Sequence, residues 1–344
     1  MTMASPGFLP PHDPFGRTAP LAYELEVPVL GVPMRIRSNA AQAIAHAELT
    51  YGAWHGLPAH LVEPRAAACF DIVVHPRTDD MLAPLAYRRH GPVFMAAAGA
   101  VMVSVLLEAD HAVAFVPAQA LDQREWFTVN VLGLAWMLAS RRRRVPLHAA
   151  VVEGASRALL LLADSGVGKS TLAYACGRAG LRVLTEDTVF VDAEGGTPRL
   201  WGALPCHWLS PDTAAVFPEL ADHPVVVRAN GKSRIRVPVA GAPVLTSVAP
   251  VTAVLIVPGG DEPVLERLAG DTLADIVAAD RTEGFDQYPE ARPAVIAWLR
   301  RQPAYRCTRG ADPRATAALL SALADEAPAV TPASTLLPLV TSIP

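Results

Sequence analysis

The segment from Ala163 to Thr171 has the residue types and spacing of a phosphate-binding loop. It follows an apolar run, Ala158–Leu162, and leads into residues 171–179, so a strand should enter the loop and a helix should leave it. Successive backbone amides in such a loop, with a helix N-terminus behind them, form a nest for phosphate oxygens. The residues expected to bind a nucleotide are Asp164, Ser165, Gly166, Val167, Gly168, Lys169, Ser170 and Thr171.

Within this loop, Lys169 and Ser170 have separate tasks. The Lys169 ammonium would reach the β- and γ-phosphates, and the Ser170 hydroxyl would ligate Mg²⁺. Ala163 stands where the motif has its first glycine, but the inner Gly166 and Gly168 are present where the backbone must crowd the phosphates. ATP and Mg²⁺ are therefore the expected cofactors. No base-reading motif accompanies the loop, so pyrophosphate or another phosphoryl donor stays open as an alternative.

The residues before the loop narrow the class of protein. Two apolar segments, 149–152 and 158–162, are joined by residues 153–157, which are too few for a crossover helix. The two strands should therefore be antiparallel, whereas ordinary P-loop NTPases feed the loop from a parallel sheet. The sequence also lacks the N-K-x-D, L-S-G-G-Q and clean Walker B patterns. These features disfavour regulatory GTPases and ABC ATPases.

Two neighbouring carboxylates, Glu186 and Asp187, end an apolar segment about 17 residues after Lys169. Beside a triphosphate, one carboxylate can hold Mg²⁺ directly or through water, while the other accepts the proton of an attacking hydroxyl. A solvated turn is the alternative reading. We expect Asp187 to join Ser170 as a metal ligand, and the sequence leaves open which of the two acidic residues is the base.

A group of cations forms a second candidate site. Lys232, Arg234 and Arg236 alternate at i, i+2 and i+4, and on a strand these positions share one face. Like charges on one face repel one another unless they meet anions, so phosphate or an acidic substrate would explain them. An exposed edge strand protected by charge is the alternative.

The segments 147–152, 164–170 and 184–187, about 45 residues with their connections, resemble the catalytic domain of HPr kinase/phosphorylase and its kinase-like relatives. Phosphoenolpyruvate carboxykinases are distant kin of that family. The resemblance implies that His148 is an active-site histidine, that Lys169 and Ser170 bind phosphate and metal, and that Glu186 and Asp187 form the acidic pair. It also allows a homo-oligomer, because the bifunctional regulators are hexamers.

The departures from the family pattern bear on the substrate. Thr171 stands where the bifunctional regulators carry an acidic residue, the acidic pair is Glu-Asp rather than Asp-Asp, and the regulators' hinge signature is not recognisable. Phosphorylase activity and HPr as the substrate are therefore in question. The layout, with Leu30–Pro33 and Ser38-Asn39 before an Ala-rich segment, is more similar to the smaller HPr-kinase-like proteins of lasso peptide biosynthesis clusters.

The sequence and the resemblance together predict an ATP- and Mg²⁺-dependent kinase that transfers the γ-phosphate to a hydroxyl. The expected acceptor is a Ser of a peptide or small protein, such as a lasso peptide precursor. A kinase for a small-molecule alcohol and a non-catalytic nucleotide-binding sensor are the alternatives.

The candidate site residues must be positioned by a folded domain, and the fold class that we expect is mixed α/β. We predict a disordered N-terminus (1–20), an α+β N-terminal domain that binds substrate or dimerises (21–144), an HPr-kinase/PEP-carboxykinase-like P-loop domain (145–326), and a disordered tail (327–344). In the first half, helices are expected at about 40–54, capped by Ser38-Asn39, and at about 122–141, where residues 126, 129, 132 and 136 share helical spacing. The basic run 141–144 is expected to be a solvated helix end.

Composition excludes several classes of protein. The 344 residues carry 29 basic and 33 acidic side chains, for a formal charge of −4, which argues against nucleic acid as a partner. The most apolar stretch, 91–107, contains Pro92 and suits a buried hairpin better than a membrane span, and the N-terminus lacks a signal-peptide pattern. A soluble cytoplasmic protein is expected. The scattered Cys69, Cys176, Cys206 and Cys307 are expected to be buried, reduced thiols.

Overall fold

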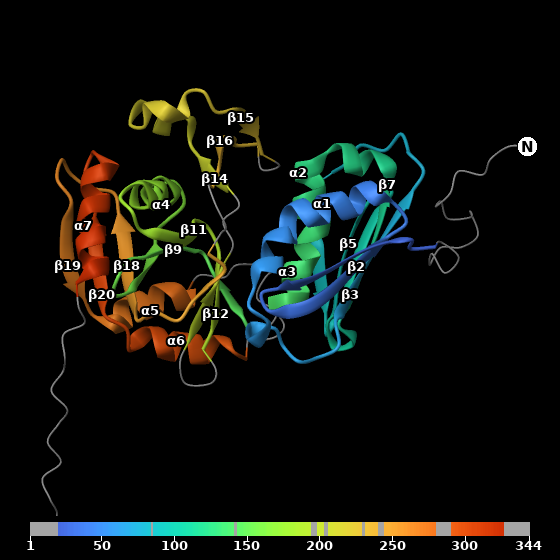
Figure 1. The fold of residues 1–344 in the computed structure, drawn as a ribbon, viewed down its shortest axis with the longest axis horizontal. Helices are drawn as coiled ribbons and strands as arrows, with labels where there is room; N and C mark the ends of the chain where they lie inside the picture. The colour runs from blue at the N-terminus through green and yellow to red at the C-terminus, as the bar shows by residue number, and fades with distance from the viewer. Residues whose placement is uncertain are drawn as a thin grey trace, which may run out of the picture.

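The computed structural model describes residues 20–83, 85–140, 143–193, 198–202, 206–228, 231–239, 244–279 and 290–326. These residues form a mixed α/β structure in which separate sheets are joined side by side (Figure 1). Residues 1–19 and 327–344, where we expected disorder, lie outside the described ranges. The predicted domain boundaries stay a prediction.

The first half of the chain builds a mixed sheet, here called the N-terminal sheet, with strand order β1-β2-β3-β7-β6-β5-β4. The β2–β3 and β3–β7 pairs are parallel and the others antiparallel. The apolar stretch 91–107 forms the β5–β6 hairpin, as predicted. The strands are β1 (Tyr23–Val29), β2 (Val32–Ser38), β3 (Ala68–His75), β4 (Tyr87–His90), β5 (Val93–Ala98), β6 (Val101–Leu106) and β7 (His111–Pro117).

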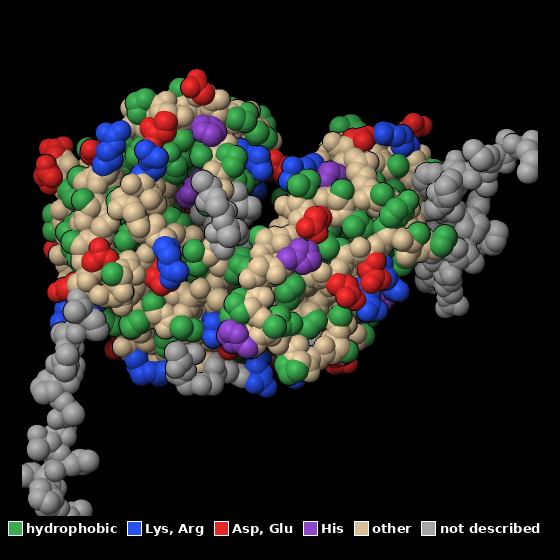
Figure 2. Space-filling view, in the orientation of Figure 1, with side chains coloured by type: hydrophobic (Ala, Val, Ile, Leu, Met, Phe, Trp, Pro, Cys, Tyr) green, Lys and Arg blue, Asp and Glu red, His purple; other side chains and the backbone are tan. Residues whose placement is uncertain are grey.

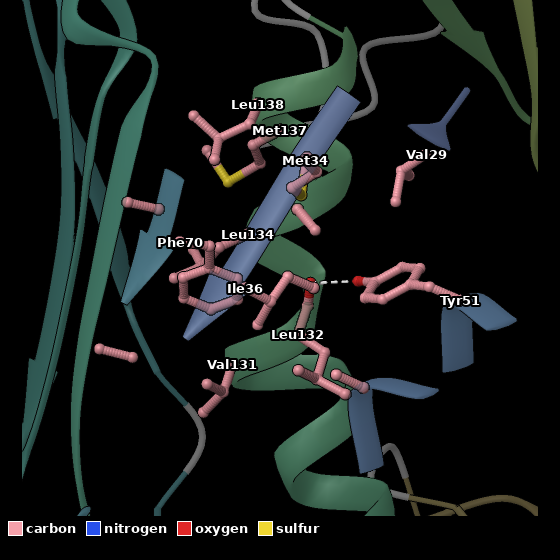
Figure 3. Close-up of a cluster of buried hydrophobic side chains, with 14 of the residues drawn as sticks. Val29, Met34, Ile36, Tyr51, Phe70, Val131, Leu132, Leu134, Met137 and Leu138 are labelled. Atoms are coloured by element: carbon pink, nitrogen blue, oxygen red, sulfur yellow. Dashed lines mark hydrogen bonds between the residues drawn. The ribbon is translucent and has the colours of Figure 1, made fainter. Parts of the chain in front are cut away.

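Helices pack on one face of this sheet and enclose its core. They are α1 (Ala41–Tyr51), α2 (Arg124–Phe127), a π-helical turn η5 (Thr128–Leu132) and α3 (Gly133–Ser140). Apolar side chains of β2 and β3, such as Ile36 and Phe70, meet Leu132 and Leu134 there, and the buried Tyr51 hydroxyl donates a hydrogen bond to the Leu132 carbonyl (Figure 3).

Two predictions about these helices were wrong in detail. The helix expected at 122–141 is interrupted by the π-helical turn, which shifts the residues that follow relative to the expected face. The expected N-cap of α1 also differs. The N-cap residue is Ala40, without a side-chain cap, because the Ser38 hydroxyl donates to the Ile72 carbonyl while accepting the Ala40 N–H.

The second half is built on a central sheet with strand order β11-β9-β10-β18-β20-β19. The β9–β10 pair is antiparallel, as the short connection predicts, while β10–β18 and β18–β20 are parallel. Helices cover both faces, so strands such as β10 are apolar throughout. The strands are β9 (Ala149–Glu153), β10 (Ala158–Leu162), β11 (Arg182–Thr185), β18 (Val251–Val257), β19 (Val264–Leu268) and β20 (Ala304–Thr308).

The helices of this half pack in pairs. The side chains of α4 (Lys169–Arg178) and α7 (Pro313–Asp325) share one hydrophobic cluster with the central sheet. Those of α5 (Gly270–Ala279) and α6 (Arg292–Arg300) share the cluster on its other face. This arrangement leaves the ends of the strands free to carry loops.

Two small sheets complete the fold. The junction sheet, ordered β17-β13-β12-β8, connects the halves, and the flap sheet, ordered β14-β16-β15, projects beside α4 (Figure 1). Their strands are β8 (Val145–Leu147), β12 (Val189–Asp192), β13 (Arg199–Trp201), β14 (Cys206–Leu209), β15 (Val225–Val227), β16 (Ser233–Pro238) and β17 (Thr246–Ser247).

Aromatic rings of the junction sheet join the core of the N-terminal half. Phe190 stacks on Trp136 with ring centroids 5.5 Å apart, and Trp201 approaches Trp54 at 6.4 Å. Arg144 is buried beneath them: its guanidinium donates to Glu63 at 2.7 Å and lies 4.8 Å from the Trp201 ring. The expectation of a solvated end for 141–144 is therefore wrong at Arg144, because the chain turns inward to enter β8.

The remaining expectations concern cysteines and membranes. The cysteines are all free thiols, but Cys69 is half-buried rather than buried, whereas Cys176, Cys206 and Cys307 are buried. In the part of the chain that the structure describes, no helix is long and apolar enough to span a membrane.

Candidate functional site

A cleft of about 700 Å³ lies where the central sheet, the flap sheet and the N-terminal helices meet. Figure 2 shows a hollow between the two halves, on the side where α2 faces the flap sheet. The lining includes Thr128, Val129, Gly133, Trp136, His148, Asp164, Ser165, Gly166, Gly168, Lys169, Ser170, Thr171, Glu186, Asp187, Trp208, Arg228, Lys232 and Arg234. Most of the residues singled out in the sequence thus face one space.

The floor of the cleft is the loop from Ala163 to Gly168, here called the Gly-rich loop, which joins β10 to α4. Gly166 and Gly168 have φ values of +91° and +106°, in the left-handed region that glycine enters without strain. This backbone shape turns successive N–H groups toward one side, and α4 begins directly behind it at Lys169. The loop can therefore receive an anion such as a phosphate group.

His148 connects the loop lysine to one of the acidic residues. It lies between β8 and β9, and its carbonyl oxygen accepts a hydrogen bond from Lys169 Nζ at 3.3 Å. Its ring nitrogen Nδ1 lies 3.3 Å from Asp187 Oδ1. The Lys169 side chain is buried, while that of Asp187 is 71% exposed to the cleft. Lys169 and Asp187 are therefore both held at His148, and Asp187 is left open to an incoming molecule.

Glu186 has different surroundings from its neighbour. Its side chain is 6% exposed, and both carboxylate oxygens are occupied: Oε2 accepts from His207 Nδ1 at 3.1 Å and Oε1 from the Trp208 N–H at 2.7 Å. His207 packs edge-on against Tyr174 of α4. Glu186 thus fastens the flap sheet to the end of β11, whereas the sequence treated the two acidic residues as equivalent.

The expected row of cations is only partly formed. Lys232 lies directly before β16, so only Arg234 and Arg236 belong to the strand itself. Lys232 and Arg234 line the cleft, but Arg236 is not among the described lining residues. Arg236 instead approaches Cys206, where burial raises the thiol pKa and the guanidinium opposes that rise.

Sequence reasoning missed Arg228, which also lines the cleft. Its guanidinium stacks over the Trp208 ring at 4.3 Å, and Nε pairs with Glu125 of α2 at 2.5 Å. This pair links the flap sheet to the N-terminal half. No local sequence motif predicts this ion pair, because Arg228 and Glu125 lie far apart in the sequence.

Sequence reasoning also missed the wall that the N-terminal half supplies. Thr128, Val129, Gly133 and Trp136, from the π-helical turn and α3, face the cleft opposite the Gly-rich loop. The sequence showed only that residues 129 and 136 share helical spacing. Val129 is 46% exposed, since the π-helical turn changes the direction of the side chains. The wall offers a hydroxyl and apolar surface.

The oxygen donors in the cleft suit Mg²⁺. The Ser170 hydroxyl and the exposed Asp187 carboxylate are hard oxygen ligands of the kind that Mg²⁺ takes, together with substrate phosphates and water. Among the described residues, no group of three or more His, Cys, Asp or Glu side chains forms a metal cage. The residues therefore fit a metal ion shared with a phosphate chain.

Comparison with known proteins gives little further guidance. No family model and no curated protein matches the chain. Among solved structures, the HPr(Ser) kinase/phosphatase from Coxiella burnetii is similar over 52% of this chain and 87% of its own, with 11% identity and a TM-score of 0.26. A TM-score of this size carries no argument about function.

Proposed function

We propose that the protein is a kinase that transfers the γ-phosphate of ATP to a hydroxyl group, with the Gly-rich loop as its phosphate-binding loop. The observation that carries the proposal is the grouping of Lys169, His148 and an exposed Asp187 beside the loop that contains the left-handed Gly166 and Gly168. A phosphate nest, a buried lysine and an open carboxylate are the groups that phosphoryl transfer requires.

In this mechanism Asp187 removes the proton from the acceptor hydroxyl as the new O–P bond forms. The bond between the γ-phosphorus and the bridging oxygen breaks, and ADP leaves with that oxygen. Lys169 and the loop amides stabilise the charge on the phosphoryl oxygens, and His148 orients Asp187. The Ser170 hydroxyl would hold Mg²⁺ together with phosphate oxygens and water, and the ion would neutralise phosphate charge. Asp187 stays off the metal in this mechanism, so that its carboxylate can accept the proton.

Glu186 is supported less well as the base, because its oxygens are already bonded to His207 and Trp208. A carboxylate in two hydrogen bonds and almost out of contact with solvent has little freedom to take up a proton. We assign Glu186 the role of holding the flap sheet in position instead.

The acceptor we propose is a Ser of a peptide or small protein, and a lasso peptide precursor is the specific candidate suggested by the family resemblance. Arg228, Lys232 and Arg234 on the flap sheet would attract an acidic segment, and the apolar Val129 and Trp136 would contact its uncharged side chains. A volume of about 700 Å³ also suits a small-molecule alcohol, which is the second candidate.

Intact-mass spectrometry tests the proposal. The protein is incubated with MgATP and a panel of Ser-containing peptides, with free serine and sugars as alternative acceptors. A gain of one phosphoryl group, absent with Lys169→Ala, is expected. Retention of full transfer by Lys169→Ala would show the assignment of the loop to be wrong, and ATP binding without ADP formation for any acceptor would favour a nucleotide sensor.

A further inference from the structure

The loops that follow β18 and β20 lie at the same end of the central sheet's strands as the Gly-rich loop. Strand β10 is parallel to β18, and β18 is parallel to β20, so all three carboxyl ends lie at that edge. In open parallel sheets, ligands bind outside these ends. Residues after Val257 and Thr308 are therefore placed beside the phosphate nest, although the sequence shows no motif there.

Arg309, directly after β20, reaches the Gly-rich loop. Its Nη1 atom lies 2.9 Å from the position that a Cβ on Gly168 would take. Its backbone N–H donates to the Val257 carbonyl at 3.0 Å, which fixes the start of the side chain. The side chain is half-buried, and within the described ranges no ion pair or hydrogen bond of its guanidinium is found. A cation is thus held beside the Gly-rich loop without an ion-pair partner among the described residues.

The position of Arg309 relative to the acidic side of the cleft is informative. Asp187 follows β11 and His148 precedes β9, on one side of β10, whereas β18 and β20 lie on the other side. Arg309 does not line the cleft that holds Asp187. A phosphate chain seated in the loop with its γ-phosphate toward Asp187 would therefore carry its nucleoside on the side of Arg309.

We propose that Arg309 binds the nucleoside end of the phosphoryl donor, with its guanidinium plane stacked on the base. This inference rests on the proposed kinase function. Guanidinium is planar and weakly hydrated, so it stacks on aromatic faces more readily than an ammonium. Through this contact the protein selects a nucleotide over pyrophosphate or another inorganic donor, without a local base-reading motif.

Calorimetric binding of MgATP and of magnesium tripolyphosphate tests the inference, because the second probe lacks a nucleoside. Arg309→Ala should weaken the binding of MgATP by about tenfold or more, as expected for loss of one stacking contact. The affinity for magnesium tripolyphosphate should stay within about twofold of that of the unaltered protein. Arg309→Lys keeps the charge but not the plane and should not restore ATP affinity. Arg306→Ala, which removes an exposed arginine of the same strand, should change neither.

Three results would overturn the inference. In Arg309→Ala, the binding of both probes could weaken equally, which would mean a phosphate contact, or the binding of MgATP could be unchanged. The third such result is full ATP affinity in Arg309→Lys. Thermal unfolding of each variant shows whether it is folded, and Arg309→Lys provides a second variant if Arg309→Ala is not. If the unaltered protein bound neither probe, the kinase proposal would be contradicted as well. If it bound ATP and substitution of Arg309 left that binding unchanged, only the inference about Arg309 would be contradicted.

Discussion

The Nδ1 atom of His148 lies 3.3 Å from Oδ1 of Asp187, while the carbonyl of the same histidine accepts a bond from Lys169. One residue therefore contacts both the lysine of the Gly-rich loop and the open carboxylate. We expect Asp187→Asn to lower kcat by about 10²- to 10⁴-fold with little change in ATP affinity, because it removes the proton acceptor but not the phosphate nest. Single-turnover phosphoryl transfer and ATP titration measure the two effects separately.

Glu186→Gln is the matched control for that experiment, since it removes the neighbouring carboxylate. The amide oxygen can still accept the Trp208 N–H, but the charge facing His207 is lost. A loss of stability of about 1–3 kcal/mol is expected from this buried pair, visible in chemical denaturation. If Glu186→Gln abolished transfer in a fully folded protein while Asp187→Asn retained it, the roles of the two carboxylates would have to be exchanged.

Two glycines with left-handed backbones flank α4, and they allow a second comparison of variants. Gly168 precedes α4 with φ +106°, and Gly180 follows it with φ +99°. Alanine at either position costs about 1–2 kcal/mol of stability, because both backbones are left-handed. Only Gly168→Ala also puts a Cβ against the Arg309 guanidinium, within the Gly-rich loop.

ATP binding should therefore be lost in Gly168→Ala and kept in Gly180→Ala, while denaturation midpoints fall by similar amounts. Titration with MgATP after confirming that each variant is folded makes the comparison. Loss of binding in both variants would mean that helix stability, rather than the loop itself, controls the site.

The sequence predicted the local parts of this site, because each depends on neighbours in the chain. Strand β10 was predicted with its observed bounds, since an apolar pentapeptide before a Gly-rich turn has few alternatives. The antiparallel β9–β10 pair followed from the short connection alone. These features need no knowledge of the rest of the fold.

What the sequence could not predict depends on distant segments. Glu186 and Asp187 are adjacent and chemically alike, and only the approach of β14 makes one of them a buried anchor. Arg309 reaches the Gly-rich loop because of the sheet order, and Val129 faces the cleft because of a π-helical turn. Neither feature leaves a periodic signal, so local patterns gave the chemistry of the cleft but not its walls.

The buried cysteines give a prediction about pH. Burial disfavours the charged thiolate and raises the pKa of Cys176 to about 12 and that of Cys307 to about 11, from an ordinary value of 9.0. Because the thiolate is the reactive form, both residues should stay unmodified by a disulfide reagent at pH 8 and react only after denaturation. Half-buried Cys69 should react first. Peptide mapping after labelling identifies each site, and early labelling of Cys176 would show that its surroundings open readily.

The Arg228–Glu125 pair leads to a prediction about the flap sheet, because it joins this sheet to α2 with side chains that are 29% and 24% exposed. Arg228 also keeps its stacking on Trp208 when Glu125 is changed, so Glu125→Ala releases the link without dismantling the flap. We expect faster hydrogen exchange at the amides of β15 and β16 in this variant, with the central sheet unaffected.

A double-mutant cycle with Arg228→Ala isolates the link itself, and a coupling free energy of about 1 kcal/mol is expected for a partly exposed ion pair. Glu48→Ala, which removes a carboxylate of α1 on the N-terminal half, is the control for loss of charge and should leave flap exchange unchanged. Zero coupling, or equal exchange in Glu125→Ala and the unaltered protein, would mean that the flap is held by Glu186 and His207 alone. In that case an acceptor could enter without breaking a contact between the halves.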